Sequence, residues 1–279
     1  MDKPTKQIID YYHSKESLLG YKLLLGGTKH FGFYPVNDMQ ISMKVAMNNM
    51  IDKLAKTLDL SKDSMVLDAG CGEGTTAIRL AEKYNIKVEG VDLLDFNIKH
   101  ANKRLFSNDI RKRVNFSVGD YTKLPYPDNH FDGVYTLETL VHAPDYKSAL
   151  LEFRRVLKPG GKLVLFEYTM PAQEDMFDEE KRMFTVMNEG SAMHSLPKFI
   201  HDTFPEKLRK AGYEKIKVQD ITEHVLPMFK RFYQLAIIPY QLIKLVGKEK
   251  RFVNATAAVT IWRYKRDFRY NIITALKPK

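Results

Sequence analysis

The chain of 279 residues has a single cysteine, Cys71, and a single tryptophan, Trp262. One cysteine excludes an intrachain disulfide and favours a reducing compartment, so we expect a cytoplasmic protein. The first residues lack the apolar stretch and small-residue cleavage site of a secretory signal, so none is expected. The longest uncharged stretch of the apolar C-terminal region, residues 232–243, is too short to span a bilayer.

An excess of positive charge is confined to the C-terminal quarter. Residues 205–279 carry 17 Lys and Arg against 6 Asp and Glu, whereas residues 1–204 carry 27 against 28. A basic surface can hold nucleic acid, an anionic membrane or a phosphorylated substrate, or it can simply be solvated. Because no nucleic-acid-binding module is appended, we expect no nucleic-acid partner. Peripheral contact with an anionic membrane stays open, and so does the oligomeric state.

Strand and helix patterns alternate between residues 64 and 168. Short apolar or alternating runs predict strands at 65–69, 87–92, 114–120, 131–137 and 162–168. Helical spacing of apolar residues predicts helices at 75–84, 95–106 and 146–157, and KPGG (158–161) predicts a turn. This alternation is typical of an α/β fold with a doubly wound, mostly parallel sheet, in which ligands bind outside the carboxyl ends of the strands.

Three segments lie outside this repeating unit and predict an α-helical lid. Residues 1–60 form a helical, aromatic segment ahead of a core that extends over 61–279. Two insertions interrupt the core: the Met- and Phe-rich residues 171–203, and the basic, amphipathic residues 223–252. Pro227 and Pro239 predict that helices begin or bend inside the second insertion.

A glycine-rich loop, Asp68-Ala-Gly-Cys-Gly-Glu-Gly74, follows the first strand and precedes a helix. Glycines allow close approach of a ligand to the backbone, and a helix N-terminus offers free N–H groups. A dinucleotide fingerprint would need Gly or Ala at position 75, where the chain has Thr75. A phosphate-binding loop would need Gly-Lys-Ser/Thr, which is absent. Cys71 is more typical of a small buried residue than of a nucleophile.

Two further acids follow the next two strands. Asp92 ends the second strand, and its carboxylate can accept hydrogen bonds from both hydroxyls of a ribose. Asp120 and Tyr121 follow the third strand, where a short carboxylate can accept from an adenine amino group and the ring can flank the base. Together with Asp68, the acids predict one ligand site at the carboxyl edge of the sheet.

These motifs resemble the class I S-adenosylmethionine-dependent methyltransferases. The matching segments are VLDAGCGEG (66–74), VEGVD (88–92), VGDYTKLPYPDNHFD (118–132) and LKPGGKLVLFE (157–167). The resemblance implies a seven-stranded Rossmann-like sheet, with later strands near 214–222 and 269–276, and S-adenosylmethionine as the methyl donor. It also implies a donor site composed of Asp68, Gly70, Cys71, Gly72, Asp92, Leu93, Asp120, Tyr121 and Leu137.

Other segments resemble the sterol C-methyltransferases and their small-molecule relatives, although the single Trp departs from the Trp-rich start of the sterol enzymes. These segments are residues 23–34, 138–144, 254–258 and 269–271. The resemblance implies Glu138 and His142 as candidate catalytic bases. It also implies aromatic and lid residues facing the acceptor: Tyr11, Tyr21, His30, Phe31, Phe33 and Tyr34.

The acceptor predicted from these features is a lipophilic small molecule such as a sterol, an isoprenoid or a quinone-like compound. Methylation of an alkene would pass through a carbocation that aromatic rings can stabilise. O- or N-methylation of a more polar metabolite stays open as the alternative. A nucleic-acid methyltransferase or a non-catalytic donor-binding protein fits less well. The spacing of the histidines and acids suggests no metal site.

Overall fold

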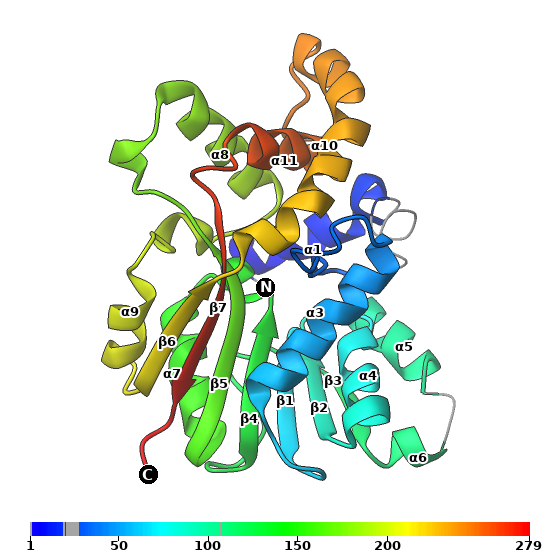
Figure 1. The fold of residues 1–279 in the computed structure, drawn as a ribbon, viewed down its shortest axis with the longest axis vertical. Helices are drawn as coiled ribbons and strands as arrows, with labels where there is room; N and C mark the ends of the chain where they lie inside the picture. Colours follow the sequence, from blue (N-terminus) through cyan, green and yellow to red (C-terminus); the bar gives the residue numbers. More distant parts are fainter. Residues whose placement is uncertain (1, 19, 21–27, 106–107) are drawn as a thin grey trace.

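The computed structural model describes residues 2–18, 20, 28–105 and 108–279. Its centre is a seven-stranded sheet in the order β3-β2-β1-β4-β5-β7-β6. The strands are β1 (Met65–Ala69), β2 (Lys87–Asp92), β3 (Val114–Val118), β4 (Phe131–Leu137), β5 (Leu157–Thr169), β6 (Glu214–Asp220) and β7 (Arg269–Leu276). Strands β1 to β5 pair in parallel, and β7 is antiparallel to both neighbours (Figure 1). The predicted seven-stranded, mostly parallel α/β sheet is confirmed.

The strand boundaries differ from the predictions mainly in β5. The segment 158–161, predicted as a turn, belongs to this strand, which runs from Leu157 to Thr169. Leu157 pairs with Phe131 and Lys162 pairs with Gly133, so the register shifts between the two pairs. The Gly-Gly pair is therefore absorbed as an irregularity inside the strand, because β5 has neighbours on both sides that hold its ends in the sheet.

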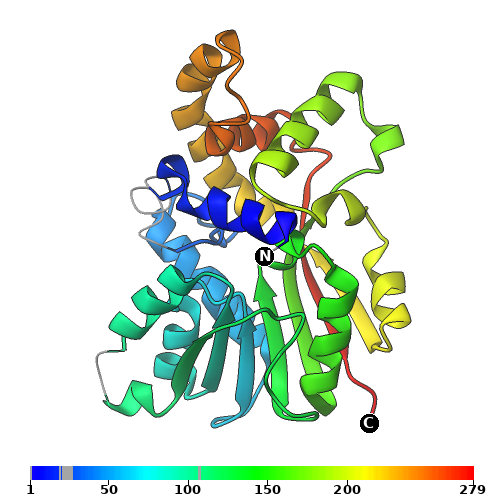
Figure 2. The same cartoon turned by 180° about the vertical axis from the view of Figure 1, so that it is seen from behind.

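Helices cover both faces of the sheet. They are α3 (Met43–Leu58), α4 (Thr75–Tyr84), α5 (Asp95–Lys103), α6 (Asn108–Arg111), α7 (Tyr146–Val156) and α9 (Phe204–Lys210). Helices α3 and α4 lie on one face, and α7 and α9 lie on the other (Figures 1 and 2). In α3, Met50, Leu54 and Leu58 repeat every four residues and are fully buried, so they form the stripe that packs on the sheet.

A second group of helices lies beyond the carboxyl ends of the parallel strands. It contains α1 (Lys3–His13), α8 (Asp178–Gly190), α10 (Thr222–Leu245) and α11 (Val253–Arg263), and short 3-10 turns lie at 140–142, 173–175 and 196–198. Helix α1 crosses the strand ends, and α11 packs against α8 and α10 (Figures 1 and 2). Helix α10 continues through Pro227 and Pro239, so neither proline begins a new helix.

These four helices have their own small apolar clusters. Ile8 and Tyr11 of α1 pack with Ala192 and Val253, and a separate cluster joins α8, α10 and α11. Within the described residues, none of the helices has both the length and the apolar content needed to cross a bilayer. The helices and the sheet edge therefore enclose the space in which the predicted site residues lie.

Candidate active site

The glycine loop lies where β1 passes into α4, and its path depends on two glycines. Gly70 has φ +96°, and a Cβ there would lie 2.6 Å from the Thr139 side chain. Gly74 has φ +76°, and a Cβ there would lie 2.4 Å from the Phe116 ring. Because both the backbone conformation and the neighbours exclude a side chain, the loop can pass close to the sheet. It borders a cavity of about 260 Å³, here named the loop cavity.

Asp92 ends β2 and is fixed by donors from three places. Its Oδ2 accepts from the Gly72 N–H at 2.8 Å, and its Oδ1 accepts from the Leu94 N–H and the Asn97 amide, both at 2.9 Å. The side chain is buried, so these bonds hold the carboxylate in one orientation at the wall of the loop cavity. A carboxylate has about four acceptor positions, so capacity remains for a ribose hydroxyl.

Asp68 lies in the same wall and has an unsatisfied oxygen. Its Oδ2 is buried and has no hydrogen-bond partner among the described residues. Burial raises the pKa of Asp68 to about 7; the Tyr135 hydroxyl acts in the opposite direction, and the nearby Asp92 carboxylate acts in the same direction as burial. A cationic ligand group beside this oxygen would satisfy it and restore the charged form, which fits the ammonium group of a methionine moiety.

The remaining predicted donor residues also line the loop cavity. They are Gly70, Cys71, Gly72, Leu93, Asp120, Tyr121 and Leu137. Asp120 is exposed at the rim, where its Oδ1 accepts from the Thr122 N–H at 2.8 Å. The Tyr121 hydroxyl donates to the Thr139 carbonyl at 3.0 Å, which fixes the ring over the cavity. Burial raises the pKa of the Cys71 thiol well above its usual range, so it is no thiolate nucleophile.

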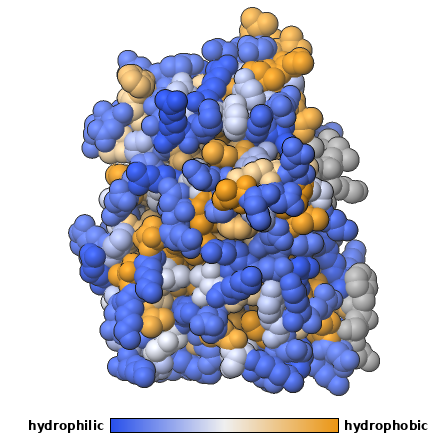
Figure 3. All heavy atoms as spheres, viewed as in Figure 1, coloured by the Kyte–Doolittle hydropathy of each residue, from blue (hydrophilic) through white to orange (hydrophobic). Residues whose placement is uncertain are grey.

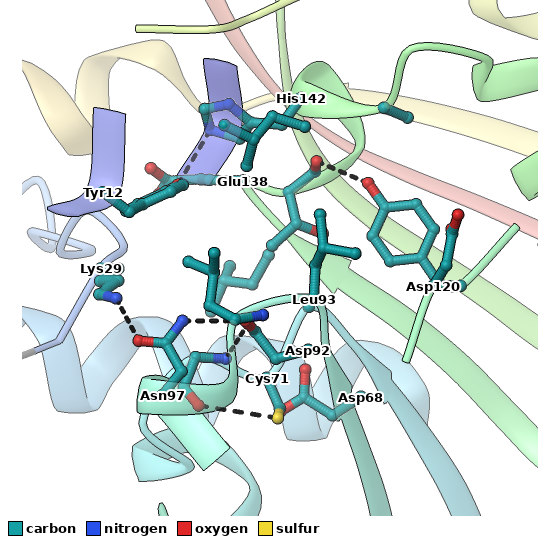
Figure 4. Close-up of a pocket in the computed structure, with 18 of the residues that line it drawn as sticks. Tyr12, Lys29, Asp68, Cys71, Asp92, Leu93, Asn97, Asp120, Glu138 and His142 are labelled. Atoms are coloured by element: carbon teal, nitrogen blue, oxygen red, sulfur yellow. Dashed lines mark hydrogen bonds between the residues drawn. The ribbon is translucent and has the colours of Figure 1, made fainter. Parts of the chain in front are cut away.

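A second, larger cavity of about 350 Å³ lies beside the loop cavity, and helices α1, α8, α10 and α11 contribute to its walls. Its walls are mostly apolar and aromatic, and we name it the aromatic cavity. They include Tyr11, Phe31, Tyr168, Met187, Met193, Phe229, Phe232, Leu235, Ile261 and Phe268. Five residues line both cavities: Tyr12, Lys29, His30, Glu138 and His142. In Figure 4, Tyr12, Glu138 and His142 lie on the opposite side of the site from Asp68 and Asp92.

Glu138 follows β4 with φ +62° and accepts hydrogen bonds on both oxygens. Oε1 accepts from the Phe31 N–H at 2.6 Å and from the Tyr270 hydroxyl at 2.7 Å, and Oε2 accepts from the Tyr168 hydroxyl. Burial raises its pKa to about 7. Its carboxylate joins the aromatic segment near Phe31 to strands β5 and β7, so this group can fix the shape of the cavity junction.

His142 ends the 3-10 turn after β4. Its Nδ1 lies 3.2 Å from the Ala192 carbonyl and its Nε2 lies 3.1 Å from the Tyr12 hydroxyl. A carbonyl only accepts, so we assign the proton to Nδ1, which leaves the lone pair of Nε2 to accept from Tyr12. Burial lowers the pKa of His142 to about 4, so the ring is neutral at physiological pH. Among the described residues, no hydrogen bond joins Glu138 to His142.

Only some of the predicted lid residues line the aromatic cavity. Tyr11 lies in the aromatic cavity and donates to the Asn254 side chain at 2.9 Å. His30 and Phe31 also line this cavity, and burial lowers the pKa of His30 to about 4. Phe33 stacks on His224 at 4.1 Å, and Tyr34 is fully buried, and neither lines either cavity. Tyr21 lies outside the described residues.

Four residues that the sequence did not single out also contribute. Lys29 donates to the Asn97 side chain at 2.6 Å and lies over the rings of Tyr12 and Phe96. Burial lowers the pKa of Lys29. Tyr168 and Tyr270 hold Glu138 from two strands that meet only in the folded sheet. Tyr168 had a signal in its position at the carboxyl end of a predicted strand. Lys29 and Tyr270 had one in the matching segments 23–34 and 269–271, whereas Asn97 had none.

Comparison with known proteins identifies the family. The Methyltransferase domain family matches residues 67–165. The S-adenosyl-L-methionine-dependent Diels-Alderase iccD of Talaromyces variabilis is 32% identical over 98% of this chain and 95% of its own length. The 27-O-demethylrifamycin SV methyltransferase of Amycolatopsis mediterranei is 32% identical over the whole of both chains. The sterol 24-C-methyltransferase ERG6B of Gibberella zeae is 31% identical over 60% of this chain and 44% of its own.

The solved structures agree with these matches. The [4+2]-cyclase SpnF superposes with a TM-score of 0.77 and 26% identity, covering 98% of this chain and 97% of that chain. The relative iccD is named as S-adenosyl-L-methionine-dependent, and the loop cavity offers acids, glycines and an unsatisfied Asp68 oxygen that suit this cofactor. The chain belongs to the class I S-adenosylmethionine-dependent methyltransferases.

Proposed function

We propose that the enzyme transfers the methyl group of S-adenosylmethionine to a lipophilic small molecule held in the aromatic cavity, with His142 accepting the proton that the acceptor loses. The observation that carries this proposal is the junction of the two cavities. A polar cavity with the donor residues meets a larger apolar cavity at five shared residues, and His142 is one of them.

The loop cavity accounts for the donor. Gly70 and Gly72 leave room for the methionine part, Asp68 faces its ammonium group, and Asp92 accepts from the ribose. The sulfonium cofactor supplies an activated methyl group and its own leaving group when bound. The chain therefore needs to form no covalent intermediate, and its contribution is to align the reactants and exclude water.

His142 is the better placed of the two candidate bases. Its Nε2 carries a lone pair that faces the Tyr12 hydroxyl at the cavity junction, whereas both oxygens of Glu138 already accept hydrogen bonds. An acceptor hydroxyl, amine or carbon acid that replaces the Tyr12 contact would give its proton to Nε2. The carbonyl of Ala192 holds the ring in the tautomer that this step requires.

Glu138 is a positioning residue in this scheme. Its three hydrogen bonds tie the segment at Phe31 to the sheet, which sets the distance between the two cavities. A negative or polar group at this junction also favours a cationic transition state beside the rings of Tyr12 and Tyr168. Methylation of an alkene, which is the C-methylation variant of this proposal, would use this feature most.

The test is a methyl-transfer screen. The enzyme is incubated with isotopically labelled S-adenosylmethionine and fractions of a cell extract separated by polarity, and mass spectrometry follows the label. The proposal predicts label in an apolar compound. Label only in polar metabolites would support O- or N-methylation of a polar acceptor instead. Label in nucleic acid would contradict the proposal.

A second candidate is an intramolecular [4+2] cyclisation, because two proteins that span almost the whole chain have cyclase names. Such a reaction converts three π bonds into two carbon–carbon σ bonds and one new π bond, and it moves no proton. An apolar cavity with aromatic walls suits it equally well. The two functions separate cleanly: S-adenosylhomocysteine, which has no methyl group to give, would support cyclisation but no methylation, and cyclisation would survive His142→Ala.

A further inference from the structure

Helix α10 is apolar on two sides, and only one of them is buried. Val225, Met228, Phe229, Ala236 and Tyr240 face the protein interior. A second row, here named the α10 stripe, consists of Leu235, Ile238, Leu242 and Leu245. Its members recur at intervals of three or four residues, so they lie along one side of the helix. Ile238 is 76% exposed and Leu245 is 82% exposed.

Such a row is more than the scattered apolar residues of an ordinary surface. Val246 continues it past the end of the helix and is also exposed. Figure 3 shows apolar side chains gathered at the end of the molecule to which α10 extends. No described element covers the stripe, although the opposite side of the same helix is packed against α8 and α11.

Basic residues surround the end of the stripe. They are Lys244, Lys248, Lys250 and Arg251, and all four are exposed. Lys250 pairs with Glu189 at 2.5 Å, and Lys244 lies 3.7 Å from Glu179. In the described part of the chain, Lys248 and Arg251 make no ion pair. The one acid within residues 244–251 is Glu249, which forms an ion pair with Arg182 and accepts a hydrogen bond from the Tyr240 hydroxyl.

We propose that the α10 stripe and the basic residues beside it dock on an anionic lipid surface, with the helix lying in the interface. An apolar row flanked by lysines and arginines is the combination that binds such a surface, because the apolar side chains enter the acyl boundary while the cations meet the headgroups. The charge decides between occupants: a second copy of this chain would bring the same positive charge to the contact.

The stripe also leads to the aromatic cavity. Leu235 and Pro239 line that cavity and are exposed at the same time, and Leu235 is the first residue of the stripe. Docking would therefore place the mouth of the cavity against lipid, and a lipophilic acceptor could enter without crossing water. This route for the acceptor rests on the proposed function, whereas the docking itself does not.

Docking is tested by co-sedimentation of the full chain with vesicles of phosphatidylcholine alone and of phosphatidylcholine mixed with phosphatidylglycerol. No acceptor is present, so failure of the proposed function cannot affect the result. We expect binding to the mixed vesicles only, and loss of binding at high salt, because the screening length falls from ~30 Å at 0.01 M to ~3 Å at 1 M. Absence of binding at low salt would overturn the proposal.

Two variants address the two parts of the surface. Lys248→Gln with Arg251→Gln should weaken partitioning by about 10- to 30-fold. Each basic residue near an anionic surface contributes about 1 kcal/mol, and about 1.4 kcal/mol corresponds to a tenfold change. Ile238→Ser with Leu242→Ser should weaken partitioning at low salt, where the parent binds, because it removes two apolar side chains from the α10 stripe. The matched control is Lys112→Gln with Lys123→Gln, which removes the same charge from exposed positions on the core and should leave binding unchanged.

Two results would count against the lipid surface. Equal loss in the control pair would mean that only net charge matters. Sedimentation velocity that shows a dimer in the parent and a monomer in the Ile238→Ser, Leu242→Ser variant, without vesicle binding, would assign the stripe to a second copy. All substituted residues are exposed and lie outside both cavities, so donor binding by calorimetry should stay at the parent value and serves as the check of folding.

Discussion

The two cavities are built from different parts of the chain. Most of the loop cavity comes from the segments that follow β1 to β4, between Asp68 and Asp145, with part of its rim supplied by α1 and residues 28–30. The aromatic cavity takes most of its walls from α1, residues 29–31, β5, α8, α10 and α11, and Phe268 ahead of β7 also lines it. The first cavity is thus fixed by sheet geometry, whereas the second depends on how separate helices pack.

This difference has a chemical consequence. The carboxyl ends of neighbouring parallel strands always lie side by side, so acids placed there converge on one ligand. Helices that pack above the sheet can change their side chains with less effect on the fold. The donor chemistry therefore stays constant while the acceptor cavity is free to vary, which suits a family whose relatives here include O- and C-methyltransferases and cyclases.

The largest effect is expected at the cavity junction. His142→Ala should lower turnover by about 10²–10⁴-fold, the usual contribution of a general base, with donor affinity nearly unchanged. Steady-state kinetics and calorimetry measure the two quantities. His13→Ala on α1 is the matched control, because this histidine is exposed and lines neither cavity. Parent turnover in His142→Ala would remove this ring as the base and leave alignment alone to explain the rate of methyl transfer.

The next largest effect is expected on donor binding in the loop cavity. Asp92→Ala should weaken donor binding by about 10- to 150-fold, which corresponds to about 1.5–3 kcal/mol for hydrogen bonds to a charged group. Calorimetric titration with S-adenosylmethionine is the measurement. Asp95→Ala, an exposed acid three residues further along, should bind the donor normally. Unchanged affinity in a folded Asp92→Ala protein would remove this carboxylate from the site.

The loop cavity could be predicted from the sequence more completely than the aromatic cavity. The strands β1, β2 and β4 begin and end where their apolar runs predict, and the residues expected for the donor all line one cavity. These features are local, because a strand end and the loop after it are adjacent in sequence. Cβ clashes at Gly70 and Gly74 involve Thr139 and Phe116, which are distant in sequence, so the reason for those glycines appears only in the fold.

The sequence predicted only part of the aromatic cavity: Tyr11, His30 and Phe31 line it, as expected. Phe33 and Tyr34 belong to the same aromatic segment as Phe31, yet they face α3 and α10 rather than the cavity. Backbone hydrogen bonds to distant residues hold that segment: Phe31 donates to Glu138, Phe33 to Ala46 and Tyr34 to His224. These contacts decide which ring faces which way. The bonds from Tyr168 and Tyr270 to Glu138 likewise depend on β5 and β7 being antiparallel neighbours, which no local pattern encodes.

A third prediction uses the pH dependence of stability at the junction. Burial raises the pKa of Glu138 from 4.5 to about 7, so the folded protein keeps this proton over a range where the unfolded chain has lost it. The free energy of unfolding therefore falls as pH rises from about 4.5 to about 7. Glu138→Gln should make this decline smaller by about 1–3 kcal/mol. Urea unfolding at several pH values in this window measures it.

The other buried groups set the background for that comparison. Burial raises the pKa of Asp68 to about 7 and that of Glu167 to about 8. Like Glu138, both groups therefore lower the free energy of unfolding as pH rises. His30 and His142, whose pKa values burial lowers to about 4, act oppositely up to about pH 6.5. All four remain in both proteins, so the difference reports Glu138 together with the part of the raised Glu167 pKa that the Glu138 charge causes. An identical pH profile in Glu138→Gln would contradict a raised pKa at this carboxyl.

The smallest expected effect concerns the bond that joins the two regions. Lys29 of the aromatic segment donates to Asn97, which in turn donates to Asp92 in the donor wall. Lys29→Met or Asn97→Ala should each weaken donor binding by about 2- to 10-fold, as expected for one neutral or partly screened hydrogen bond. If the chain of bonds acts as a unit, the double variant should bind like the single variants, because the second change removes a contact that is already lost. Calorimetry on the four proteins gives the coupling. Strictly additive losses would mean that each residue touches the donor independently, and the two cavities would then be neighbours without being linked through this contact.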